Sequence, residues 1–411
     1  MIRRSHKKSR TGCLQCKRRH VKCDESRPIC RLCANSNIAC SFTSQLAKSA
    51  STPASSSTSP SPTPLTLPPS PNPPPESPLD APLNTHHLAL LLHLTNPPPA
   101  PASKSMFNLS HHIGDYTTST SFALQTAFAH PYLLHALLAF SARHLAALTP
   151  PEATPSQRRR RDEHLHLAVS LQTRAVSLFN ATALQGGDKA AVDRTNCVAV
   201  LLFSSVLGHH LFADTLLARG SLGGDGDGGE GLDSFLHRYV QCMEMHRGVY
   251  AVAAAAWPLL MATEVGPTIR ASASFTSRPP AGRDCDGLRE VVEGAAGMSW
   301  EEREACRRAI RHLQVGFDAV AETERDVTYR FQMIFLWTML ASVEFGRLLS
   351  AKRPEALLLL GHYALLLHYG REMWQVGDAG RYVLEMVLGE LGPEWHRWLE
   401  VPRQTIARDY T

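Results

Sequence analysis

Apolar residues recur three and four positions apart in six stretches of the chain, all of them after residue 83. This spacing gathers the apolar side chains on one face of a helix, and it predicts helices over residues 122–148, 165–179, 198–217, 235–261, 331–349 and 356–367. The alternation of apolar and polar residues that indicates strands is scarce. Residues 83–411 are therefore predicted to form one large all-α domain.

Two local signals support helix starts in this domain. Ser299 and Glu302 have the spacing of a capping box, and Pro354 precedes a leucine-rich run as a proline in a first helical turn would. Two loops are expected to interrupt the helices, over residues 219–231 and roughly 266–297. The first contains Asp225 to Gly229, which begins like a calcium loop but lacks the later oxygen ligands, so a flexible connector is predicted.

An aromatic stripe and four scattered thiols are the other notable features of the domain. Stripes of this kind are usually core, and the alternative is the wall of a lipid pocket; the residues are Phe331, Phe335, Trp337 and Leu340. The thiols have no metal-ligand spacing and are predicted to be buried or incidental, at Cys197, Cys242, Cys285 and Cys306.

A segment rich in proline and serine, residues 45–82, precedes the helical domain. Positions 51–80 hold eleven of the 28 prolines and eight serines. Such a segment cannot bury enough apolar surface to offset the entropy lost on ordering, so it is predicted to be a disordered linker. It has no heptad pattern, and no dimerising coiled coil is expected in it.

Charge is spread unevenly along the chain. The formal net charge is +5, yet residues 1–44 carry eleven Lys or Arg against Asp24 and Glu25, a balance of +9. A small basic head on a mildly acidic body indicates a module that binds a polyanion.

Several classes of protein are disfavoured by what the chain lacks. No apolar run follows the first basic residues, so a secretory signal is not expected and clustered thiols are interpreted as metal ligands. The uncharged stretches 195–213 and 248–263 are interpreted as buried helices rather than membrane spans. Since no nucleophile elbow, phosphate loop or dinucleotide fingerprint is present, we expect no catalytic activity.

Histidine pairs and one arginine run have weaker interpretations. The pairs at 86–87, 111–112 and 209–210 have no HExxH pattern or matching carboxylate, and they are predicted to be surface or core groups. The four arginines at 158–161 indicate either a nuclear import signal or the solvated start of a helix.

Six cysteines within 28 residues give the strongest signal. Each half of the cluster is a CxxC pair followed, after six intervening residues, by a third cysteine; the residues are Cys13, Cys16, Cys23, Cys30, Cys33 and Cys40. Two separate tetrahedral zinc sites would need eight ligands, so six thiolates can hold two ions only if two sulfurs are shared. The spacing predicts two Zn²⁺ ions per chain, with folding dependent on them. Redox CxxC pairs, RING or ribbon sites and copper stores have different spacing or composition.

The segment from Cys13 to Cys40 resembles the binuclear zinc cluster of the fungal Zn(2)-C6 transcription factor family. The flanks agree as well: Arg10-Thr-Gly-Cys13, Cys16-Lys-Arg-Arg-His-Val-Lys-Cys23 and Arg27-Pro-Ile-Cys30. The resemblance implies that Cys13 and Cys30 bridge the metals and that Pro28 lets the halves fold back on each other. The first domain is accordingly placed at residues 1–44, as a zinc-cluster DNA-binding domain.

The cations around this cluster imply contacts with double-stranded DNA. Lys17, Arg18, Arg19 and Lys22 follow the second cysteine, and the family reads CGG triplets in the major groove from this segment. His20 stands where the family has its main base-reading Lys or Arg, so either Arg19 takes over or the triplet preference differs. The other cations, including Lys7, Lys8 and Arg10, are expected to contact phosphates.

Short phrases of the body resemble the sterol uptake control branch of the family. They include Phe128-Ala-His-Pro-Tyr-Leu-Leu-His and Glu394-Trp-His-Arg-Trp-Leu-Glu. The resemblance implies a helical effector domain over residues 83–411, a homodimer through this C-terminal domain, a small apolar, sterol-like ligand and contact with the transcription machinery in the nucleus. Control of a specialised-metabolite pathway stays open. The alternatives are an enzyme or an interaction scaffold that uses the zinc head for localisation.

Overall fold

The computed structural model describes residues 12–18, 21, 23–26, 29–35, 40–42, 84–96, 116–150, 152–185, 192–217, 231–322 and 327–409. The chain divides into two compact units, Met1–Ala81 and Pro82–Thr411, and each is described by itself. The predicted linker, residues 45–82, lies outside the described residues, as does most of the predicted loop 219–231.

The first unit contains two short helices, α1 (Leu14–Arg18) and α2 (Arg31–Asn35). Each begins directly after the first cysteine of a CxxC pair, and the carbonyl of that cysteine accepts an i to i+4 backbone hydrogen bond of the helix. The amide of Lys17 donates to the carbonyl of Cys13 at 3.1 Å, and the amide of Ala34 donates to the carbonyl of Cys30 at 2.9 Å. The repeated spacing in the sequence therefore gives the same local structure twice.

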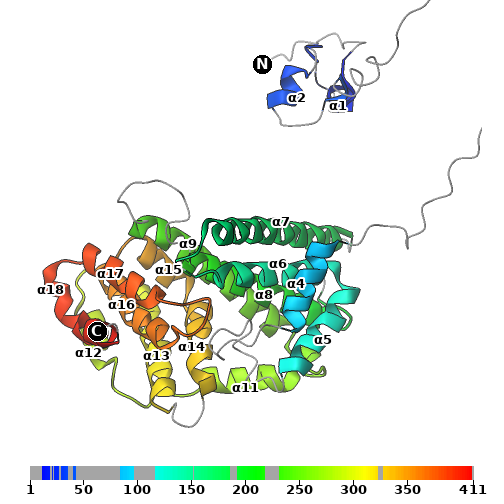
Figure 1. The fold of residues 1–411 in the computed structure, drawn as a ribbon. Coiled ribbons are helices and arrows are strands. Elements are labelled where there is room, and N and C mark those ends of the chain that lie inside the picture. Colours follow the sequence, from blue (N-terminus) through cyan, green and yellow to red (C-terminus); the bar gives the residue numbers. More distant parts are fainter. Residues whose placement is uncertain are drawn as a thin grey trace, which may run out of the picture. The chain divides into compact units, whose positions relative to one another are not determined.

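The second unit is built from helices throughout its described residues (Figure 1). Their bounds are α4 (Thr85–Thr95), α5 (Tyr116–Ala129), α6 (Pro131–Ala147), α7 (Pro155–Gln185), α8 (Cys197–Leu217), α9 (Leu232–Ala255), α10 (Trp257–Leu260), α11 (Gly266–Thr276), α12 (Asp286–Gly294), α13 (Trp300–Ala321), α14 (Val327–Leu340), α15 (Val343–Ser350), α16 (Pro354–Tyr369), α17 (Ala379–Glu390), α18 (Pro393–His396), the 3₁₀ turn η5 (Arg397–Leu399) and α19 (Glu400–Arg408). The all-α prediction is confirmed.

Three of the predicted helices are interrupted in the structure. The stretch 122–148 falls on α5 and α6, because Pro131 lacks an amide hydrogen and starts a new helix. In the same way, 235–261 divides into α9 and α10 near Pro258. The stretch 331–349 bends by 91° between α14 and α15, where the hydroxyl of Ser342 accepts a hydrogen bond from the amide of Phe345. Apolar spacing continued across each break, so the spacing alone did not reveal them.

The predicted loop 266–297 is wrong. It contains α11 and α12, each about three turns or fewer in length. Pro267 occupies the first turn of α11, and in α12 Leu288 and Val292 are buried one turn apart. These helices are too short to be stable alone and depend on the packing of such residues. The capping box at Ser299 and Glu302 and the first-turn position of Pro354 are confirmed.

Helix α16 lies at the centre of the larger core. Its residues are buried on every side from Glu355 to His368, so it has no face toward water. The indole of Trp337 in α14 stacks on Tyr363 with ring centroids 4.3 Å apart, and its Nε1 donates to the carbonyl of Ala309 in α13 at 3.0 Å. Phe335 and Trp337 are both buried, in agreement with the core interpretation of the aromatic stripe.

A second core is formed by side chains of the five helices from α4 through α8. It contains Leu94, Leu124, Leu133, Phe140 and Phe203, and Trp374 also belongs to it. Helix α8 is long and apolar enough to cross a membrane by length and composition, and 56% of its most apolar window is buried inside the structure. The core helix of a helical domain has the same properties, which agrees with the interpretation of this stretch as a buried helix.

Candidate zinc centre and nucleic-acid interface

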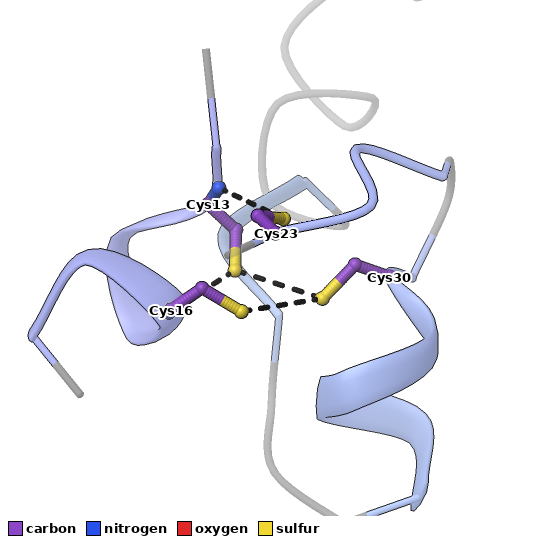
Figure 2. Close-up of side chains that lie close together, drawn as sticks. All are labelled: Cys13, Cys16, Cys23 and Cys30. Carbon is purple, nitrogen blue, oxygen red and sulfur yellow. Dashed lines mark hydrogen bonds between the residues drawn. The ribbon is translucent and has the colours of Figure 1, made fainter. Parts of the chain in front are cut away.

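The structure brings the six N-terminal cysteines together in one buried cluster. All are at most 4% exposed, none forms a disulfide, and the side chain of Phe42 packs against them. Figure 2 shows four of the side chains converging from the start of α1, the start of α2 and the segment at Cys23. The cluster thus collects the thiols that the sequence predicted as metal ligands.

The sulfurs form two groups of four that share two members. One group is Cys13, Cys16, Cys23 and Cys30, and the other is Cys13, Cys30, Cys33 and Cys40; within each group all sulfurs lie within 4.8 Å of one another. Cys13 and Cys30 therefore belong to both groups. This is the sharing that lets six thiolates supply four ligands to each of two ions.

The distances between sulfurs fit zinc. With a Zn–S bond of about 2.3 Å, two sulfurs of one tetrahedral site lie about 3.8 Å apart. The Sγ atom of Cys13 lies 3.7 Å from that of Cys30 and 3.6 Å from that of Cys33, and the Sγ atoms of Cys16 and Cys30 are 3.7 Å apart. A disulfide would need about 2.0 Å. The donor set, its spacing and its burial all suit Zn²⁺.

Backbone amides orient several of these sulfurs. The amide of Cys16 donates to the Sγ atom of Cys13 at 3.4 Å, and the amides of Cys13 and Glu25 donate to the Sγ atom of Cys23 at 3.5 and 3.4 Å. Glu25 has a positive φ of 57°, which is uncommon for a residue with a side chain. This conformation turns its amide toward the cluster, and such N–H groups stabilise thiolate charge.

Side chains that the sequence analysis did not select hold the frame of the cluster. The Asp24 carboxylate accepts the amide of Arg31, the first residue of α2, at 3.1 Å. The hydroxyl of Ser41 accepts the amide of Leu14 at 3.0 Å, and the Gln15 side chain accepts the amide of Ser41 at 2.9 Å. The partners are seven residues apart in the contact of Asp24 with Arg31 and 26 residues apart in that of Gln15 with Ser41. No local sequence pattern therefore predicts these contacts.

The ionisation of the thiols reflects their mutual contacts. Burial would raise the pKa of Cys13, but hydrogen bonds from the Cys16 amide and from neighbouring thiols outweigh it and lower the pKa to about 6. Burial raises the pKa of Cys33 to about 12, reinforced by Cys30 and Cys13, and burial likewise raises the pKa of Cys16. Without a metal, these contacts favour ionisation of Cys13 before that of Cys16 or Cys33.

Of the predicted DNA contacts, the structure describes two. Lys17 and Arg18 form the last turn of α1, and both are exposed. The remaining ones, Lys7, Lys8, Arg10, Arg19, His20 and Lys22, lie outside the described residues, as does Pro28.

The arginine run at 158–161 belongs to the first two turns of α7. Arg159 and Arg161 form ion pairs with Glu163 and Asp162, respectively. The run is therefore part of a helix, as the interpretation of a solvated helix start expects, and the alternative of a nuclear import signal stays a prediction. Of the histidine pairs, 86–87 lies on α4 and 209–210 on α8, and 111–112 lies outside the described residues.

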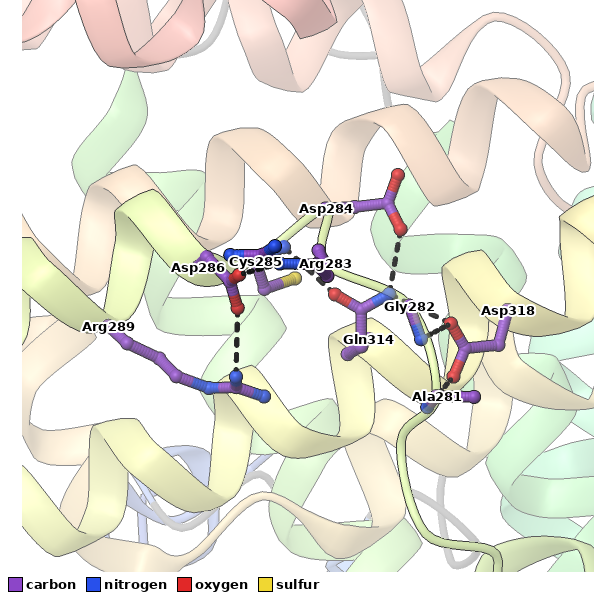
Figure 3. A network of polar contacts seen from close by, with 9 residues as sticks. All are labelled: Ala281, Gly282, Arg283, Asp284, Cys285, Asp286, Arg289, Gln314 and Asp318. Atoms are coloured by element: carbon purple, nitrogen blue, oxygen red, sulfur yellow. Dashed lines mark hydrogen bonds and ion pairs between the residues drawn. The ribbon is translucent and has the colours of Figure 1, made fainter.

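A polar network in the body has a structural explanation. The Asp318 carboxylate accepts the amides of Ala281 and Gly282 at 2.7 and 2.9 Å, and the Gln314 side chain accepts the amide of Cys285 at 2.9 Å (Figure 3). The same amide group of Gln314 donates to Asp284 and Asp318. The network fastens the turn before α12 onto α13. Cys285, like Cys197, Cys242 and Cys306, is buried, as predicted.

The comparison with protein families decides what the cluster is. A family model described as the fungal Zn(2)-Cys(6) binuclear cluster domain matches residues 11–49. Residues 11–49 are a fungal zinc-cluster domain. The cluster therefore binds two zinc ions, and the predicted family resemblance is confirmed.

Individual relatives extend the comparison beyond this zinc-cluster domain. A Zn(2)-C6 fungal-type transcription factor of Gibberella zeae is 27% identical over 99% of this chain and 87% of its own length. The transcription factor afumD of Aspergillus fumigatus is 34% identical over 37% of this chain, and the match spans only 36% of that protein. Sterol uptake control protein 2 of Saccharomyces cerevisiae is 54% identical over 10% of this chain, a match that spans 4% of its own length.

These relatives are named as transcription factors or as a control protein and not as enzymes, in agreement with the expectation that the chain has no catalytic activity. No solved structure matches the chain.

Proposed function

We propose that the chain is a zinc-dependent transcription regulator that binds double-stranded DNA through its zinc-cluster domain. The observation that carries the proposal is the pair of sulfur groups that share Cys13 and Cys30. The ligands in this proposal are the six clustered cysteines, with Cys13 and Cys30 as bridges. When bound, zinc supplies the cross-links that a segment of this size needs in order to keep a fixed shape.

The residues of this chain would then present cations to DNA. Lys17 and Arg18 are exposed in the last turn of α1, and Cys13 and Cys16 hold this helix to the cluster. We propose that this segment, with Arg19, His20 and Lys22, reads a CGG-like triplet in the major groove. Contacts by Lys7, Lys8 and Arg10 to phosphates would add affinity without sequence information.

For the body we propose a regulatory role in the nucleus. It would contact the transcription machinery, associate with a second copy and respond to a small apolar, sterol-like ligand, or serve a specialised-metabolite pathway. The support is the name of the yeast relative at the zinc-cluster domain and the apolar character of the helical body. Extraction of lipids from the purified chain tests the ligand: recovery of a sterol in near-stoichiometric amount supports it, and recovery of none contradicts it.

The central test combines metal content and DNA binding of the full chain. We expect elemental analysis to give two zinc ions per chain, and binding to a CGG-containing duplex to disappear with a chelator and return with added zinc. A scrambled duplex of the same length and composition is the control. One zinc ion per chain, or equal binding with and without chelator, would contradict the proposal.

A further inference from the structure

Helices α4 and α5 lie side by side at one end of the body and form a surface without formal charge (Figure 1). Neither α4, residues 85–95, nor α5, residues 116–129, contains a single Asp, Glu, Lys or Arg. A solvent-facing surface normally carries roughly a quarter to a third of its residues as these four types. Two adjacent helices without any of them therefore differ from an ordinary solvated surface.

The exposed residues on this surface include large apolar side chains. Leu88 is 48% exposed, Leu92 is 64% exposed and Phe128 is 65% exposed. Between the two helices runs an open groove of about 540 Å³, and its lining is mainly apolar. A surface that has few charged residues and exposes leucine and aromatic side chains is typical of the centre of a protein interface. We call this surface, with Leu88, Leu92 and Phe128 at its centre, the α4–α5 face.

The α4–α5 face is held rigidly from behind. Leu94 of α4 and Leu124 of α5 are buried in the second core, and the hydroxyl of Ser141 in α6 donates to the carbonyl of Leu90 at 2.8 Å. The imidazoles of His93 and His144 also meet, with Nε2 and Nδ1 3.1 Å apart. The buried sides of the helices are thus already engaged, and the exposed leucines cannot turn inward without breaking these contacts.

We propose that the α4–α5 face binds the same face of a second copy of this chain. In a symmetric dimer each surface meets itself, so a charge near the twofold axis would face a like charge, and a charge elsewhere would be buried unless the same face carried an opposite charge at the matching position. A face without charge avoids both costs. An acidic or basic partner would find no opposite charge here, which favours a partner as uncharged as the face itself.

The spacing of the exposed side chains suits packing between helices. Leu88 and Leu92 are exposed and one turn apart on α4, and Phe128 is exposed on α5, on the other side of the groove. Rows of side chains four residues apart form the ridges that enter the groove of a facing helix pair. The leucine ridge of one copy would enter the groove of the other, and symmetry would repeat the contact.

This assignment rests on the proposed self-association of the body and names the surface responsible for it. Since α4 is the first helix after residues 45–82, a dimer formed here would join two chains at the point where both segments leading to the zinc-cluster domains begin. No coiled coil is expected in those segments, so the α4–α5 face would supply the pairing itself.

Sedimentation velocity of the full chain, without DNA and at micromolar concentration, tests the assignment. We expect a dimer for the unchanged chain, and monomers for Leu92→Glu and Phe128→Glu. Each substitution places its charge twice in a symmetric interface, so the dimer affinity should fall by roughly a hundredfold or more. The matched control is Val401→Glu on α19, where the native side chain is 67% exposed, and this variant should stay dimeric.

The outcomes separate the surface from the other proposals. Far-UV circular dichroism of each variant should match the unchanged chain, since the substituted side chains face solvent. A monomeric unchanged chain would overturn self-association altogether, and a dimer that persists in both Glu variants would overturn the α4–α5 face alone. Zinc content and binding to a single CGG half-site should be equal in the unchanged chain and in all Glu variants. If the unchanged chain holds no zinc or does not bind the half-site, that result contradicts the proposed function and not the interface.

Discussion

Acidification should destabilise the body, because buried histidines remain neutral in the folded chain. His246 of α9 is buried, with its Nδ1 atom 2.6 Å from the hydroxyl of Thr338. His362 of α16 is also buried, and its Nδ1 atom donates to the carbonyl of Leu358 at 3.1 Å. Burial lowers the pKa of each to about 4, although the backbone contact of each partly opposes it.

The magnitude follows from the difference between the folded and unfolded pKa. In the unfolded chain a histidine has a pKa of about 6.5, so as the pH falls the unfolded chain takes up the proton first and gains stability relative to the fold. At pH 5 a group with a folded pKa of about 4 lowers the free energy of unfolding by about 2 kcal/mol, and two such groups lower it by about 4 kcal/mol. That loss is large beside the 5–15 kcal/mol, roughly, that stabilises a typical domain.

Urea unfolding of the full chain at pH 7 and pH 5, followed by the far-UV dichroism of the helical body, measures this loss. His246→Asn and His362→Asn each alter packing, which changes stability at both pH values alike. The informative quantity is the difference between the two pH values, which should shrink by about 2 kcal/mol in each variant. Substitution of the exposed His237 by Asn is the control and should leave the difference unchanged. A difference that is the same in all four proteins would refute the assignment to His246 and His362.

Three further outcomes are expected. Cys30→Ser should lower the zinc content of the chain more than Cys40→Ser, measured by elemental analysis, because the sulfur of Cys30 belongs to both groups and that of Cys40 to one; equal losses would argue against the sharing. Gly282→Ala should destabilise the body by about 1–3 kcal/mol in thermal or urea unfolding, because its new Cβ would lie 2.5 Å from side-chain atoms, whereas Gly294→Ala meets nothing within 4 Å and should not. Lys7→Ala should weaken binding to all DNA sequences and reduce the slope of log affinity against log salt by about one, as measured by a salt titration; an unchanged slope would exclude a phosphate contact.

The metal centre could be predicted from the sequence because its information is local. Cysteines at CxxC spacing in a basic segment are most simply explained as metal ligands. The spacing occurs twice, and six thiolates satisfy two four-coordinate zinc ions when two of the sulfurs are shared. The supporting contacts could not be predicted in the same way. The pairing of Ser41 with Leu14 and Gln15 depends on how the two halves of the cluster fold together, and no periodic pattern records that.

The helical body illustrates the same limit. The 3.6-residue spacing of apolar side chains marks a buried face, and it persists where two helices follow each other at an angle, as at Pro131 and Ser342. Proline and a capping serine were present at these points as local signals of a break. Helix α12 was missed for a different reason: it is short, and the turn before it is fastened by Gln314 and Asp318, roughly thirty residues further along the chain.

The complete burial of α16 restricts how the body can transmit a signal. Because α16 is packed on all sides, it cannot slide or rotate unless the helices around it separate. That separation would expose most of the apolar core to solvent at once. Gradual rearrangements are therefore confined to peripheral helices that keep a solvent-exposed side, such as α7 and α19. If the body has the proposed regulatory role, a bound ligand would act by moving one of these outer helices relative to α16.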